Sequence, residues 1–260
     1  MRLNLGPGGT DGLGYEKGIP EIKKRGLDAL EIEYTYGVNM KVEVARKVGE
    51  LAKKNGISLS VHAPYYVNLA SDENHKVTAS VQRILQSCER AHHLGAKYVV
   101  FHPGFYQKKD PLDVFELVKG QIIEIQEKIK ENSWDVKLAP ETTGKPSQFG
   151  SVEELMRLHK ETGCHVCVDF AHLKARCQGD IDYNEVIQQI KPLGHIHAHF
   201  SGIEWTAKGE KKHLITEEDV IVPLAEAIIK NDLDITIINE SPQPIDDAVK
   251  MKEVFERLMG

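Results

Sequence analysis

Eight short apolar runs recur along the chain, and a longer amphipathic stretch separates each run from the next. Short apolar runs bounded by turn residues are typical of strands that are buried on both faces. Buried strands that alternate with helices require a parallel sheet, and eight such units close most naturally into a barrel. The predicted strands cover residues 2–6, 27–33, 57–62, 97–102, 136–141, 165–170, 195–200 and 235–240.

The stretches between these strands carry apolar residues at helical spacing. Several end in glycine, as in Lys54-Asn55-Gly56, and Lys24-Arg25-Gly26 marks a further helix end in the same way. No linker interrupts the pattern, so we predict a single parallel (β/α)8 TIM barrel, one domain over residues 1–260. The other predicted helices cover residues 42–54, 76–94, 114–130, 152–161, 184–191, 217–230 and 245–258.

The composition, with 41% hydrophobic and 28% charged residues, is that of a globular protein with a sizeable core. No apolar stretch is long enough for a signal peptide or a membrane span, so we expect a cytoplasmic protein without a membrane partner. Cys164 and Cys167 form a C-x-x-C pair. In a strand, an offset of three residues places side chains on opposite faces, so we expect no joint redox or zinc role.

The strand ends should carry the chemistry, because active sites of such barrels lie at the carboxyl ends of the strands. Six consecutive predicted strands finish on or beside a histidine or a carboxylate. One such histidine is usually structural, but converging imidazoles and carboxylates would bury charge unless cations neutralised them. We therefore predict a divalent metal cluster, for which zinc fits best, with manganese, iron or cobalt as alternatives. Its ligands are His62, His102, Glu141, Asp169, His172, His199 and Glu240.

The histidines deeper in the strands are expected to pack or to support the ligands. Among them, His197 shares a strand face with His199.

The strings around the predicted ligands carry a family resemblance. They read SVHAPYYVNL at 60–69, VFHPG at 100–104, PETTG at 140–144, VCVDFAH at 166–172, AHFSG at 198–202 and NESP at 239–242. These strings resemble endonuclease IV, the metal-dependent apurinic/apyrimidinic endonuclease family of the xylose isomerase-like TIM barrels. They occur in the family's order and cover most of the chain.

The resemblance implies a cluster of two or three zinc ions in which two ions share Glu141. The first ion would bind His62, His102 and Glu141, and the second would bind Glu141, Asp169, His199 and Glu240.

A third ion would bind His172 and His213. In the family, an aspartate two residues before that last histidine completes the third site, but this chain has Lys211 there. Two alternatives follow: Glu210 substitutes from one residue further back, or the third ion is weak or absent.

The activity implied by the resemblance is hydrolysis of a DNA phosphodiester bond 5′ to an abasic site, in base excision repair of damaged double-stranded DNA. Two close metals can activate water and stabilise the attacking and leaving oxygens, so Glu141 would act catalytically as the bridging carboxylate. In the family, residues at the positions of Tyr65 and Tyr66 press into the duplex beside the flipped nucleotide. Ordinary packing over the rim is the alternative for this pair. We expect a monomer.

Basic residues follow the fourth to seventh predicted strands, so a protein of net charge −6 can still present a basic rim to phosphates. A merely solvated surface is the alternative. The loop at residues 34–39 lacks the arginine expected to contact DNA in the family. The residues of the basic rim are Lys108, Lys109, Lys145, Lys174, Arg176, Lys208, Lys211 and Lys212.

Two other functions fit parts of the pattern. Sugar isomerases and epimerases on the same barrel use a single metal, here matched by Glu141, Asp169, His199 and Glu240, and they need neither His102 nor His213. A barrel that binds metal or DNA without turnover is the second alternative, which the lysine at position 211 supports.

Overall fold

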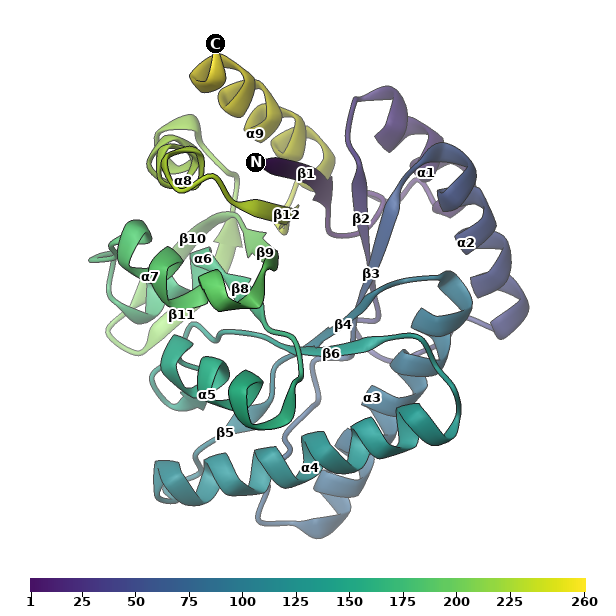
Figure 1. The fold of residues 1–260 in the computed structure, drawn as a ribbon, viewed down its shortest axis with the longest axis vertical. Helices are drawn as coiled ribbons and strands as arrows, with labels where there is room; N and C mark the ends of the chain where they lie inside the picture. Colours follow the sequence, from purple (N-terminus) through teal and green to yellow (C-terminus); the bar gives the residue numbers. More distant parts are fainter.

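Eight parallel strands line the centre of the protein in a computed structural model that describes all of residues 1–260 (Figure 1). They pair in two four-stranded sheets, in the orders β1-β12-β9-β8 and β2-β3-β4-β6. Parallel bridges from Gly8 to Glu31 and from Glu141 to Cys167 link the two sheets at both edges, so the strands form a ring. The strands are β1 (Arg2–Pro7), β2 (Ala29–Glu33), β3 (Ser58–His62), β4 (Tyr98–Phe101), β6 (Lys137–Pro140), β8 (Cys167–Asp169), β9 (His195–Phe200) and β12 (Asp234–Asn239).

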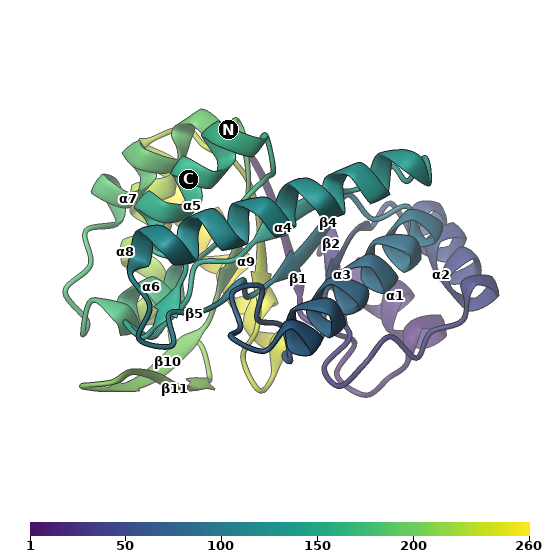
Figure 2. The ribbon, with the colours of Figure 1, turned by 90° about the horizontal axis from the view of Figure 1, so that it is seen from below.

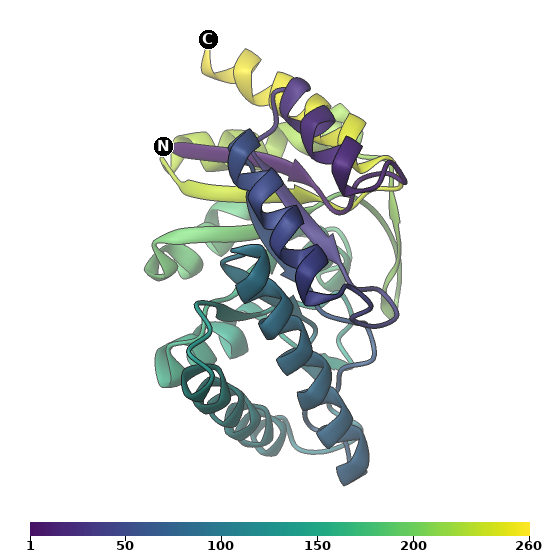
Figure 3. The same cartoon turned by 90° about the vertical axis from the view of Figure 1, so that its right-hand side faces the viewer.

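Helices surround this ring (Figure 1). Neighbouring helices pack against each other, and Figure 3 shows α1 to α4 side by side in chain order, from purple to teal. None of the helices combines the length and the apolar character needed to cross a membrane. The helices are α1 (Tyr15–Lys24), α2 (Val42–Asn55), α3 (Asn74–Leu94), α4 (Pro111–Glu131), α5 (Val152–Thr162), α6 (Phe170–Arg176), α7 (Tyr183–Ile190), α8 (Glu218–Lys230) and α9 (Pro244–Met259).

The predicted fold class is confirmed: each predicted strand corresponds to one strand of the ring, and the predicted helices lie on the outside. Gly56 and Gly95 close α2 and α3 in the left-handed conformation, with φ of 66° and 69°. The main apolar core lies between the strands and the helices. Cys164 belongs to this core, whereas Cys167 lies in a small separate cluster with Tyr98, so the two thiols of the C-x-x-C pair are apart.

Four short strands add two antiparallel pairs. β5 (Gly104–Phe105) pairs with β7 (Gln148–Phe149), and β10 (Gly202–Thr206) pairs with β11 (Gly209–Leu214). The β10–β11 hairpin follows the carboxyl end of β9 and projects beyond the barrel (Figure 2). The apolar pattern predicts no strand between residues 200 and 217, whereas the structure has this hairpin, which places His213 over the barrel end.

Candidate metal centre

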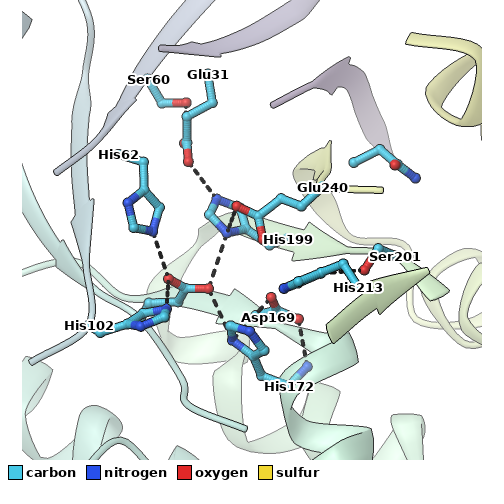
Figure 4. Close-up of polar contacts among 12 residues, drawn as sticks. Glu31, Ser60, His62, His102, Asp169, His172, His199, Ser201, His213 and Glu240 are labelled. Atoms are coloured by element: carbon cyan, nitrogen blue, oxygen red, sulfur yellow. Dashed lines mark hydrogen bonds and ion pairs between the residues drawn. The ribbon is translucent and has the colours of Figure 1, made fainter. Parts of the chain in front are cut away.

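The structure brings the predicted metal ligands together at the carboxyl end of the barrel (Figure 4). Strands β3 and β8 end at His62 and Asp169, and Glu141 directly follows β6. Their nitrogen and oxygen atoms form three adjoining groups, and within each group these atoms lie within 4.8 Å of one another. The groups are His62 with His102 and Glu141; Glu141 with Asp169, His199 and Glu240; and Asp169 with His172 and His213.

Glu141 occupies the centre of the cluster and is completely buried. Its Oε2 lies 3.1 Å from Nε2 of His62 and 2.9 Å from Nε2 of His102. Its Oε1 lies 3.2 Å from Nδ1 of both His172 and His199. Burial acts to raise the pKa of Glu141, but the surrounding histidines hold it well below its usual range. The carboxylate therefore faces two adjoining ligand groups at once, which is the geometry a bridging ligand requires.

Backbone contacts fix which nitrogen of His62 faces the cluster. Its Nδ1 lies 2.7 Å from the carbonyl oxygen of Ala63, which can only accept a hydrogen bond. Nδ1 therefore carries the hydrogen, and the lone pair of the neutral ring lies on Nε2, toward Glu141. Orientation of this kind, set by a carbonyl behind the ring, is usual for histidines that bind metals.

Two glutamates of β2, outside the predicted ligand set, support the cluster. Glu31 is completely buried, its Oε1 lies 2.8 Å from Nε2 of His199, and its Oε2 lies 2.9 Å from Nε2 of His197. Ser60 donates a hydrogen bond of 2.5 Å to the same carboxylate. Glu31 thus turns Nδ1 of His199 toward the ligands, and His197 takes the supporting role that was expected of it.

Glu33 is the second of these residues, and its carboxyl group lies beside those of Glu31 and Glu240. Burial and the charges of these two neighbours raise the pKa of Glu33 to about 8, against the opposing charge of His62. Glu33 ends the predicted strand 27–33. The rule that selected the other strand ends would therefore have selected it as well.

The donor set fits divalent cations. Oδ2 of Asp169 and Nε2 of His172 are buried and have no hydrogen-bond partner, although buried polar atoms are normally paired. Carboxylate oxygens and imidazole nitrogens, without a thiolate, suit zinc and manganese. A cation between these atoms would satisfy acceptors that the protein alone leaves open.

Cation uptake should release protons. Burial acts to lower the pKa of His62, but the hydrogen bond with Glu141 and the charge of Glu33 raise it to about 10 in the metal-free protein. His62 is therefore protonated at pH 7 and must lose its proton to become a ligand. We expect the apparent Zn²⁺ affinity to rise between pH 6.5 and 8, by about tenfold per pH unit for each proton released.

Titration calorimetry in buffers of different ionisation enthalpy measures this release directly. The observed enthalpy should depend on the buffer, with at least one proton released per chain. An enthalpy that is independent of the buffer would contradict the assignment of His62.

Fold and site together define an α/β barrel with a cluster of potential metal ligands at the carboxyl ends of its strands. A family model described as "Xylose isomerase-like TIM barrel" matches residues 19–258, and the chain belongs to this family. An uncharacterized protein from Methanocaldococcus jannaschii, MJ0133, is 34% identical over 93% of this chain and 92% of its own length.

Other relatives and solved structures carry two kinds of name. "Probable endonuclease 4" from Mycobacterium leprae is 28% identical, over 65% of each chain. Among solved structures, endonuclease IV from Thermus thermophilus has a TM-score of 0.73 and 22% identity, covering 100% of this chain and 99% of its own. A D-tagatose 3-epimerase-like protein has a TM-score of 0.77 and 21% identity, covering 100% and 97%. At these identities, the solved structures show the fold alone.

Proposed function

We propose that the protein is a divalent metal-dependent endonuclease that cleaves the DNA phosphodiester 5′ to abasic sites, with two or three bound zinc ions. The observation that carries the proposal is the three-part ligand cluster. His102 and His213 extend it beyond the four residues that a single-metal sugar enzyme uses. The relatives named endonuclease 4 support the same class of substrate. We also predict that the protein is monomeric, cytoplasmic and made of one domain.

Divalent cations held by these residues would supply activated water at neutral pH and neutralise the charge of the phosphate. The chain's own residues position that chemistry. Glu141 belongs to the first two ligand groups, so it would help to hold a cation in each of them. Glu31 holds the ring of His199 from behind. No serine, cysteine or threonine nucleophile is required.

The exposure of Tyr65 and Tyr66 near the ligand cluster supports a role in DNA contact. They follow β3 directly beyond His62, and their exposed fractions are 55% and 65%. The ring centre of Tyr65 lies 5.9 Å from that of His62 and 6.4 Å from that of His102. Exposed aromatic rings beside a phosphate site are suited to stacking on unpaired bases.

Replacing Tyr65 or Tyr66 with alanine should weaken binding of a duplex with one abasic analogue by about tenfold or more, because stacking on one base contributes about 1–3 kcal/mol. Fluorescence anisotropy on the metal-loaded protein measures the dissociation constants. Leu117→Ala, an exposed apolar residue on the outer helix α4, is the control and should change nothing. Wild-type affinity in both tyrosine variants would show that the pair only covers the rim.

The basic rim is smaller than the sequence suggested. The Arg176 guanidinium donates hydrogen bonds to the carbonyl oxygens of Lys145 and Gln148, so it holds that loop in place. Lys211 and Lys212 pair with Glu204 on the hairpin. Lys109 pairs with Asp72, at 2.6 Å. The cations left for phosphate contact are Lys108, Lys145, Lys174 and Lys208.

A single-metal sugar epimerase is the second candidate, and one observation favours it. The quartet of Glu141, Asp169, His199 and Glu240 is complete, and Glu33 adds a carboxyl group beside Glu240. Paired carboxyl groups next to one metal are suited to moving a proton beside a carbonyl.

One assay separates the candidates. The zinc-loaded protein is incubated with a 5′-labelled duplex carrying one tetrahydrofuran abasic analogue, with the undamaged duplex and a chelator as controls, and bound metal is counted by elemental analysis. The endonuclease predicts a single cut 5′ to the analogue that the chelator prevents. Intact DNA with one ion per chain and conversion of a ketose would establish the epimerase. Metal and DNA binding without any turnover would establish the non-catalytic barrel.

A further inference from the structure

The third ligand group has a lysine, Lys211, at the position where the resemblance to endonuclease IV implies an aspartate. Lys211 stands two residues before His213, and in a regular strand residues two apart point to the same face. A lysine on that face would place a positive charge beside His172 and His213. The structure avoids this arrangement.

A β-bulge shifts the alternation of β11 at this point. Glu204 pairs with Lys212 and Trp205 pairs with Glu210, so Lys211 is an extra residue without a partner on β10. A bulge of this kind reverses the facing of all residues on one side of it. Glu210, three residues before His213, therefore shares the face of that histidine.

The side chains follow this backbone. The Lys211 ammonium group lies 2.6 Å from Oε1 of Glu204, on the hairpin's exposed side. Oε2 of Glu210 lies 3.5 Å from Nε2 of His172. Gly144 makes room for this approach, because a Cβ atom there would lie 2.5 Å from Cβ and 2.8 Å from Oε2 of Glu210.

Hydrogen bonds place the lone pair of each neutral histidine ring, His172 and His213, on Nε2. Nδ1 of His172 lies 3.0 Å from the carbonyl oxygen of Thr142, so Nδ1 carries a hydrogen and Nε2 faces Glu210. The Ser201 hydroxyl donates to the carbonyl oxygen of Gly202 and accepts from Nδ1 of His213, at 2.7 Å (Figure 4). Imidazole lone pairs and a carboxylate at one point repel each other unless a proton or a cation lies between them.

We infer that Glu210 is a ligand of a third divalent cation, together with His172, His213 and Asp169. The bulge at Lys211 thus places Glu210, three residues before His213, on the face of that histidine. The inference rests on the metal cluster of the proposed function, but it concerns metal binding alone. It holds whether the loaded protein cuts DNA or converts another substrate.

Metal counting tests the inference. The wild-type protein, loaded with Zn²⁺ and freed of loosely held ion, should contain three ions per chain by elemental analysis. Glu210→Gln should contain two, with affinity for the third ion at least about tenfold weaker in competition with a fluorescent chelator. Gly144→Ala should lose the same ion, because the added methyl group displaces Glu210 without changing any charge.

Glu204→Gln is the matched control, since it removes a carboxylate of the same hairpin that faces Lys211, and it should keep three ions. Circular dichroism checks that each variant is folded. Two ions in the wild type, or three ions of unchanged affinity in Glu210→Gln, would overturn the inference. If the wild-type protein does not cut DNA but Glu210→Gln still loses one ion, only the proposed function is refuted.

Discussion

Glu141→Gln is expected to leave the protein folded but to lower the rate of abasic-site incision by at least about 1000-fold. Glu141 joins two ligand groups, and both of its oxygens contact imidazole nitrogens. Glutamine has nearly the same shape but only one acceptor oxygen and no negative charge. Neither group can then hold its cation at full strength, and the two-metal arrangement is lost.

Elemental analysis and single-turnover incision of the abasic duplex measure this effect. The variant should lose at least one ion per chain, and added zinc should not restore the wild-type rate. Glu127→Gln, an exposed glutamate of the outer helix α4, is the matched control and should behave like the wild type. Incision by Glu141→Gln at the wild-type rate would remove this residue from the mechanism.

The fold could be predicted because each barrel strand carries its own apolar signal. β4, for example, reads YVVF and is buried along its whole length between the barrel interior and the outer helices, so a continuous apolar run marks it as a strand. The β10–β11 hairpin has no such signal. Gly209–Leu214 reads GEKKHL and is largely exposed, so no apolar alternation marks it as a strand.

The candidate site could be predicted as far as it follows the strand ends. That rule found His62, Glu141 and Asp169, because parallel strands end at the same face of a barrel. Glu33 ends the second predicted strand and fits the same rule, but it was not among the predicted ligands. Glu31 is harder to predict from the sequence. Only its complete burial inside the barrel distinguishes it from an ordinary strand glutamate, and that burial depends on the closed ring of strands.

The placement of Lys211 shows a stricter limit on what residue spacing can predict. Counting back two residues from His213 gives a lysine, and this suggested a weak or missing third site. Whether position 210 or 211 faces the site depends on how β10 pairs with β11, and a bulge changes that facing without any sequence motif of its own. Residue spacing within one segment therefore cannot identify this ligand; the pairing of two segments can.

His102→Ala should distinguish the endonuclease from the single-metal alternative. His102 directly follows β4, and its Nε2 lies 2.9 Å from Oε2 of Glu141. It belongs to the group with His62 but not to the four-residue group that would serve a sugar enzyme. We expect the variant to lose one ion and to lower incision by at least about 1000-fold, because one of the two adjoining cations is missing.

The fold should survive this substitution, because the His102 side chain keeps 21% of its surface exposed at the strand end and does not fill the core. Metal content, circular dichroism and incision are measured in parallel with His75→Ala, whose exposed histidine lies on the outer helix α3. Full incision by His102→Ala would contradict the two-metal assignment. An epimerase would instead keep its single ion and its ketose turnover in this variant, because the quartet around Glu240 would be intact.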